Sequence, residues 1–209
     1  MKFDEILKFR HACKVFDENK KISDDEFDKI IEAGRISPSS MGLEPWDFWL
    51  IKDESLRLNL KKVCWNQAQF STASHILVVF AKIKDLKINS QYVREMVERR
   101  VDKNSQEHDA FIEKINNFLK NNIGQSDLEI YAWTKAQCFL AAQNMMNMAA
   151  NLGIDSCPIE GFSSADELQK VLNVDIKDKR VALILTFGYR KNNQPKKIRR
   201  KKEEILTIK

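Results

Sequence analysis

The sequence of 209 residues is 43% hydrophobic and 31% charged. This composition can bury one substantial core and is not that of a disordered chain. No apolar run approaches the ~20 residues of a membrane-spanning helix, and the first residues contain no apolar signal segment, so we expect a cytoplasmic protein without a membrane partner. The four cysteines are too few for a disulfide scaffold and form no CxxC pair, which predicts buried thiols and no metal site.

The net charge of +5 is unevenly distributed. Residues 190–202 contain eight cations and no acid, so the rest of the chain has a net charge of −3. A nucleic-acid-binding protein usually carries its basic patch on a folded face rather than on a tail. Nucleic-acid binding by this tail is therefore the less favoured interpretation. The favoured one is a local role for a few of its cations.

The first half of the chain contains three helical patterns and two strand patterns. Apolar residues at helical spacing predict a short helix over residues 3–10. Ser23 and Glu26 form a capping box that starts a second helix, which ends before Pro38. An aromatic and branched segment at residues 46–51 predicts a strand, and residues 54–64 predict a helix. The apolar run at residues 75–83 indicates a strand that is buried on both faces.

One long helix dominates the second half of the chain. Residues 127–152 form the strongest helical pattern, and its middle, at 136–150, is apolar almost all round, which indicates a central helix or one at a subunit interface. Gly153 suits its C-terminal cap. Before it, residues 88–122 form a polar helical excursion that offers few residues to a core. After it come a short helix at 164–172, a strand at 180–189 and a basic C-terminal arm at 190–209. Few strands among long helices indicate an α+β or α/β fold around one small sheet, and we expect residues 1–209 to form a single domain.

The common catalytic signatures are absent. The six glycines form neither GxGxxG nor GxxxxGK[ST], so neither a dinucleotide fold nor a P-loop is indicated. The chain also lacks HExxH and GxSxG, and its three histidines do not indicate a metal site or a serine-hydrolase triad.

Four segments are more suggestive. Residues 10–14 place three basic-type residues at a helix end, where they either complement the helix dipole or bind an anion. Residues 37–46 are small and could approach a planar ligand closely, although they could equally be an ordinary loop. Residues 158–162 form a rigid Pro/Gly turn that can aim a backbone N–H. In the tail, Lys197 and Arg199 are two residues apart and could bind one phosphate if that segment is extended.

Together, in this order, these segments resemble the FMN-dependent nitroreductase family, and in particular its oxygen-insensitive NAD(P)H nitroreductases. The similarity extends over nearly the whole chain. The matching motifs are RHxxKxFD at 10–17, SPSSxxxxPW at 37–46, Asn66 ahead of ASHxxVVF at 73–80, LGxDxxPIEGF at 152–162 and PKxxR at 195–199.

The resemblance implies an α+β nitroreductase-like fold with a small, mostly antiparallel central sheet surrounded by helices. It also implies an intertwined homodimer that binds FMN tightly between its subunits. The FMN-binding residues implied for one subunit are Arg10, His11, Ala12, Lys14, Asn66, Pro158, Ile159, Glu160, Gly161, Lys197 and Arg199, and those expected from the partner subunit are Pro38, Ser39, Ser40 and Gly42.

The implied roles follow the chemistry of the flavin. Arg10, Lys197 and Arg199 would bind the phosphate, because several partly desolvated cations suit a group with up to two negative charges. Lys14 would lie near flavin N1 and O2, where a cation stabilises the reduced ring. The backbone N–H of Glu160 or of the next residue would lie near N5.

The implied activity is ping-pong transfer of two electrons from NADH or NADPH, through FMN, to a nitroaromatic or a quinone. Lys14 and Glu160 would support the flavin, and no protein acid or base is required. Asn66, Gln69 and Phe118, together with Lys14, would face the nicotinamide or the acceptor. A dehalogenase or a dehydrogenase on the same fold is the alternative.

The sequence departs from the family pattern at four positions. Ala12, Gly42, Glu44 and Gln69 stand where a serine, an asparagine, a glutamine and, in some relatives, a lysine are found. These departures affect the expected affinity for flavin, its potential and the NADH or NADPH preference. Cys13, beside Lys14, could be either a redox-sensitive thiol or, more simply, a packed small residue.

Overall fold

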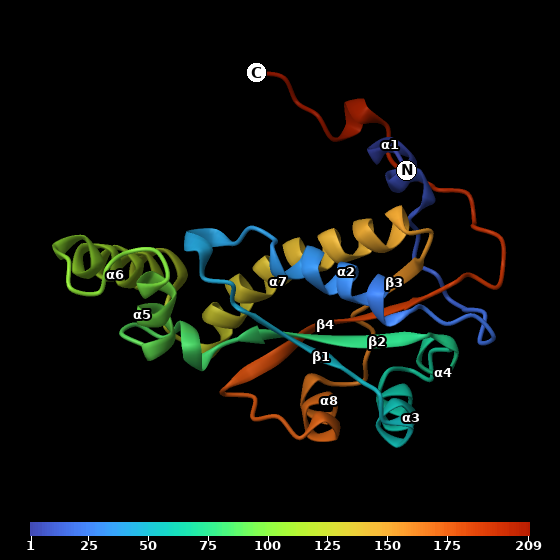
Figure 1. Ribbon diagram of the computed structural model, residues 1–209, viewed down its shortest axis with the longest axis horizontal. Helices are drawn as coiled ribbons and strands as arrows, with labels where there is room; N and C mark the ends of the chain where they lie inside the picture. Colours follow the sequence, from blue (N-terminus) through green and yellow to red (C-terminus); the bar gives the residue numbers. More distant parts are fainter.

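The computed structural model describes residues 1–209 and contains one antiparallel sheet of four strands, in the order β1-β2-β4-β3. These strands are β1 (Trp46–Leu50), β2 (His75–Lys82), β3 (Asp155–Ile159) and β4 (Lys179–Gly188). Every neighbouring pair is antiparallel, so the α+β class and the small antiparallel sheet are confirmed. Figure 1 shows the sheet running through the centre of the molecule.

The apolar run at the centre of the sheet is buried on both faces, as predicted. Along β2, Leu77 and Val79 point to one hydrophobic cluster, whereas Ile76, Val78 and Phe80 point to a second. This alternation follows the two-residue period of a strand. The core therefore consists of two layers separated by the sheet.

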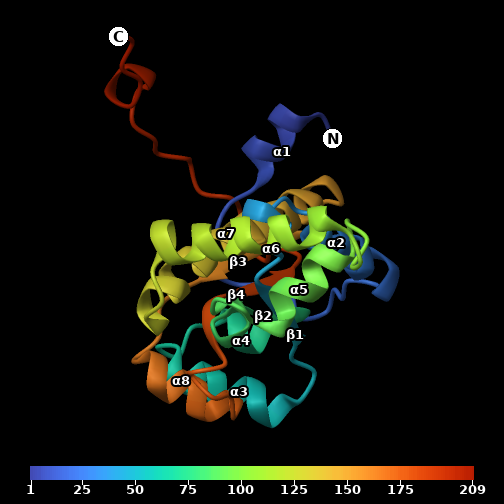
Figure 2. The same cartoon turned by 90° about the vertical axis from the view of Figure 1, so that its left-hand side faces the viewer.

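Two helical layers cover the sheet (Figure 2). On one face lie α2 (Asp24–Arg35) and the long α7 (Asp127–Asn151), which supply residues to the first cluster. On the other face lie α3 (Glu54–Val63), α4 (Gln69–Thr72) and α8 (Ala165–Leu172). The helix α1 (Phe3–Phe9) protrudes beside the C-terminal arm (Figures 1 and 2). No helix of the structure is long and apolar enough to cross a membrane.

The polar excursion at residues 88–122 contains α5 (Gln91–Glu98), α6 (Gln106–Phe118) and one π-helical turn (Leu119–Ile123). The expectation that this segment offers few core residues is wrong. Val93, Val97 and Ile115 belong to a third cluster of ten buried residues. Their helical spacing among charged residues makes each helix amphipathic. The average polarity of the segment does not reveal this, because the apolar residues gather on one face of each helix.

The strand β3 runs into the segment at residues 158–162, which was expected to be a turn. Pro158 lies within it and pairs with Leu185 of β4. A proline is tolerated here because β3 is an edge strand, so the missing N–H is not needed by a second neighbour. The strand carries the start of the Pro158–Gly161 segment to the edge of the sheet.

Candidate functional site

Three cations meet where the C-terminal arm passes α1. Burial and the charge of Arg199 lower the pKa of Arg10, and burial together with Arg10 and Arg199 lowers the pKa of Lys197. None of the three forms an ion pair, and the buried Nε of Arg10 has no hydrogen-bond partner. A bound anion would relieve this repulsion and accept from the free N–H, so the cluster fits the phosphate of the expected FMN.

The arm is held in place by an ion pair between the half-buried Arg190 and the buried Asp155. The guanidinium of Arg190 donates from Nε to Oδ2 of Asp155 at 3.0 Å and also covers the Phe9 ring, with its carbon 4.2 Å from the ring centroid. Further along, Gln194 donates to the carbonyl of Lys8, and Lys197 donates to the carbonyl of Leu7. Arg190 therefore has a structural role among the eight cations of the tail.

Residues 11–14 lie beside the edge strand β3. Ala12 forms a parallel bridge with Ser156, and the N–H of Cys13 donates to the Ser156 carbonyl at 3.0 Å. This pairing brings the Lys14 ammonium within 3.6 Å of the Cys157 sulfur. A cavity of about 190 Å³ lies against this segment and the arm residues Asn192, Asn193 and Pro195.

His11 and Cys13 differ from Lys14 in their surroundings. Burial and the charge of Arg190 lower the pKa of His11, which favours a neutral imidazole, although Nδ1 lies 3.5 Å from Asp155 Oδ1. Burial raises the pKa of Cys13 to about 11. A thiol with so high a pKa forms little thiolate at neutral pH, which favours the packed small residue over the redox-sensitive thiol.

The Pro158–Gly161 segment is fixed by contacts from two other elements. Glu160 pairs with Lys135 of α7, at 2.9 Å between Oε1 and Nζ. The Gly161 carbonyl accepts from Nε2 of Gln67 at 3.0 Å. A side chain at Gly161 would collide with the Trp65 ring, since a Cβ there would lie 2.6 Å from a ring carbon.

The loop opposite this segment is strained. Trp65 and Asn66 have φ angles of 56° and 53°, a conformation that costs a bulky side chain free energy and that often marks a functional site. Trp65 is 65% exposed despite its size. The sequence alone did not single out Trp65, Gln67 or Lys135, because no local pattern brings α7 or the end of α3 to the segment after β3.

Gln69 and Phe118, both expected near the nicotinamide or the acceptor, have partners within the protein. Gln69 is only 2% exposed, and its Nε2 lies 3.5 Å from both the Cys157 sulfur and Oε1 of Gln67. Phe118 is half-buried and packs edge-on against Trp133, at 5.9 Å between ring centroids. Asn66 and Lys14 are exposed.

The Pro38–Gly42 loop lies apart from the three cations within one chain. In Figure 1 it lies toward the α5–α6 end, whereas α1 and the arm are at the other. Its contacts are to α7, where the N–H of Ser40 donates to Gln137, and to Arg100, which donates to the carbonyls of Met41 and Gly42. Gly42 has a φ angle of 58°, and a Cβ there would lie 1.8 Å from Nη2 of Arg100.

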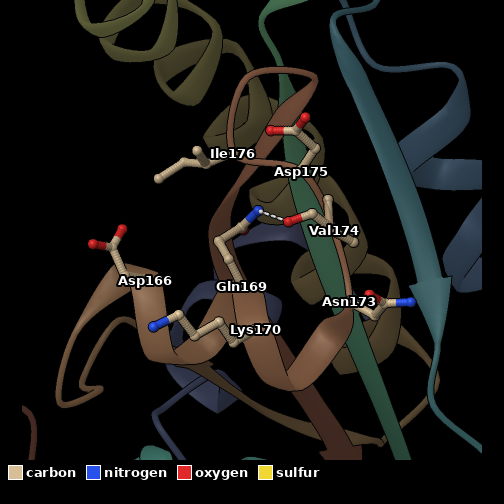
Figure 3. Close-up of a pocket in the computed structure, with 7 residues that line it drawn as sticks. All are labelled: Asp166, Gln169, Lys170, Asn173, Val174, Asp175 and Ile176. Atoms are coloured by element: carbon tan, nitrogen blue, oxygen red, sulfur yellow. Dashed lines mark hydrogen bonds between the residues drawn. The ribbon is translucent and has the colours of Figure 1, made fainter.

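A larger hollow, of about 540 Å³, lies elsewhere, between α8 and the loop at residues 173–176 that follows it (Figure 3). Gln169 is the buried polar residue in its wall. Its Nε2 donates to the carbonyls of Val174 and Lys179, and its Oε1 accepts from the N–H of Val181. Because the chain already satisfies this amide, the wall of the hollow contains no buried polar side chain that lacks a partner.

The sheet, its helical layers and the three clustered cations define an α+β protein with a candidate anion site beside an edge strand. Residues 7–189 match the model of the Nitroreductase family, and the chain belongs to this family. It is 36% identical to the protein named "Putative NAD(P)H nitroreductase YfkO" of Bacillus subtilis (strain 168), over 97% of this chain and 95% of that protein. It is 41% identical to "Putative NAD(P)H nitroreductase SA2311" of Staphylococcus aureus (strain N315), over 97% of this chain and 93% of that protein.

Solved structures share the fold at lower identity. The protein named "putative nitroreductase ydfN" of Bacillus subtilis superposes with a TM-score of 0.87 at 22% identity, covering 99% of this chain and 98% of that one. A nitroreductase-type protein of Exiguobacterium sibiricum, solved in complex with FMN, superposes with a TM-score of 0.85 at 23% identity, covering 100% and 98%. The nitroreductase-like fold is thereby confirmed.

Proposed function

We propose that this protein is an FMN-dependent NAD(P)H oxidoreductase that reduces nitroaromatics and quinones, with the two substrates bound in turn at one site. The observation that carries the proposal is the group of three unpaired cations around the orphaned Nε of Arg10. Relatives at 36% and 41% identity that are named as NAD(P)H nitroreductases support the donor, and the FMN-bound fold relative supports the cofactor.

The chain's own residues would bind and orient the cofactor rather than transfer protons. Arg10, Lys197 and Arg199 would hold the phosphate, and the ammonium of Lys14 would place a positive charge at the pyrimidine edge of the ring. The Pro158–Gly161 segment would cover one ring face. FMN, when bound, supplies the two-electron chemistry, and the exposed Trp65, whose ring lies against Gly161, could limit access to the site.

The site would be completed by a second copy of the chain, in a homodimer formed through α7. This helix exposes a stripe of apolar and small residues at helical spacing, which comprises Leu128, Ala132, Ala136 and Leu140. Small residues allow two helices to approach closely, and an exposed apolar stripe favours association. The Pro38–Gly42 loop, which is remote from the cations of its own chain, would then reach those of the partner.

Cofactor content of the purified protein tests the proposal. We expect yellow protein with about one FMN per subunit, and an Arg10→Ala variant with at least tenfold weaker FMN binding because a phosphate contact is lost. The Lys202→Ala variant is the control, since Lys202 is exposed and far along the arm. Colourless protein that takes up no added FMN would exclude this function.

Steady-state kinetics then tests the reaction. A nitrofuran and a quinone should both be reduced, with parallel lines in double-reciprocal plots against NADH or NADPH, as expected for ping-pong order. Reduction of a halophenol without reduction of the nitrofuran would instead indicate a dehalogenase on the same fold.

A further inference from the structure

A chain of polar contacts runs beneath the residues expected to contact the flavin ring. The Lys14 ammonium lies 3.6 Å from the Cys157 sulfur, and the same sulfur lies 3.5 Å from Nε2 of Gln69. Gln69 Nε2 also lies 3.5 Å from Oε1 of Gln67, whose Nε2 donates to the Gly161 carbonyl at 3.0 Å. One connected path therefore links the ammonium to the Pro158–Gly161 segment.

The central atom of this path is a buried sulfur with two N–H donors aimed at it. Cys157 is fully buried in β3, and its own thiol lies 3.6 Å from the Pro158 carbonyl, so it can donate there while its lone pairs accept from Lys14 and Gln69. Its position is fixed by the sheet, because it pairs with Thr186 of β4 and its carbonyl accepts from the Thr186 hydroxyl.

We propose that Cys157 and Gln69 are positioning residues that hold the Lys14 ammonium at the flavin ring without neutralising it. The inference rests on the proposed function. A carboxylate at this place would pair with the ammonium and cancel much of its field at the ring. A neutral thiol is a weak acceptor, so it restrains the side chain and leaves the full positive charge available to the cofactor.

The role of Gln69 follows from its two contacts. Its amide has its N–H groups directed at Cys157 and Gln67 and is only 2% exposed, so the side chain is oriented inward. Gln69 bridges the Cys157 sulfur to Gln67. It thereby connects the Lys14 ammonium, expected at the pyrimidine edge of the flavin, to the Pro158–Gly161 segment, expected near N5. This assigns Gln69 to the floor of the site in place of a direct nicotinamide contact.

Binding of oxidised and reduced FMN to the apoprotein tests this role, because the ratio of the two dissociation constants reports how strongly the protein stabilises the reduced ring. In Cys157→Val, which fills the buried position with an apolar side chain but loses the acceptor, we expect oxidised FMN to bind within threefold of the wild type. Reduced FMN should bind about tenfold more weakly, the scale of one hydrogen bond to a charged group. For a two-electron couple this ratio corresponds to a potential about 30 mV lower.

Three further variants make the result specific. Cys157→Ser keeps a hydroxyl acceptor and should stay within threefold of the wild-type ratio. Gln69→Leu should shift the ratio in the same direction as Cys157→Val. In a Lys14→Met background the Cys157→Val change should leave the ratio unaltered, because the charge that it positions is gone.

The outcomes separate this inference from the function on which it rests. Wild-type protein that binds neither form of FMN would overturn both. Wild-type protein that binds FMN, with an unchanged ratio in Cys157→Val or the same shift with and without Lys14, would overturn the positioning role alone.

Discussion

At the scale of single residues, two histidines should make stability depend on pH. Burial and the charge of Arg57 lower the pKa of His75, as burial and Arg190 lower that of His11. When the pH falls below 6.5, the ordinary pKa of histidine, the unfolded chain therefore binds protons at these two residues more readily than the folded chain does. The free energy of unfolding should therefore fall as the pH is lowered through 6.5. Above that pH both histidines are neutral in either state, and no stability is lost through them.

The variant His75→Phe isolates one of these groups. A phenyl ring can keep the stacking on Phe27, whose ring centroid is 4.1 Å from that of His75, but it cannot titrate. Urea unfolding between about pH 7.5 and about pH 5 should show a shallower loss of stability than in the wild type, with the remaining slope due in part to His11. Equal slopes in the two proteins would contradict the assignment to His75.

At the scale of elements, the turn at residues 40–42 depends on Arg100, which lies just after the end of α5. Gly42→Ala should destabilise the protein by about 1–2 kcal/mol through its positive φ, and by about 1 kcal/mol more through displaced Arg100 hydrogen bonds. Gly153→Ala is the matched control, because Gly153 also has a positive φ, of 76°, but has no atom within 4 Å of the added Cβ. In an Arg100→Ala background the two alanine substitutions should cost the same by urea unfolding, and a persistent excess for Gly42 would contradict the contact.

The elements also show what sequence reasoning could and could not reach. A capping box located the start of α2, and long apolar segments located α7 and β2, since these signals are local. The strand β3 was missed because a proline in a short segment indicates a turn, and only its place at the sheet edge makes it a strand. In the same way, the motifs identified Lys14, whereas its contact with Cys157 arises from the pairing of two segments distant in sequence.

At the scale of the whole molecule, the two halves of the expected flavin site lie at different ends of one chain. The three cations lie by α1 and the arm, and the Pro38–Gly42 loop lies toward α5 and α6 (Figure 1). A single copy thus holds the three cations without the loop that is expected to accompany them at the flavin. Assembly through α7 would join the two, so cofactor retention should depend on residues that contact no cofactor.

A charge on the exposed stripe of α7 tests this dependence. Leu140 is 46% exposed in one chain, and burying a glutamate there against an apolar partner surface would cost several kcal/mol. We therefore expect Leu140→Glu to sediment as a monomer and to lose most of its FMN. The matched control is Leu58→Glu on α3, where the leucine is 56% exposed on the opposite layer and the same charge should remain in water. If Leu140→Glu stays dimeric and yellow, α7 is not the interface, and the loop must reach the cations by some other arrangement.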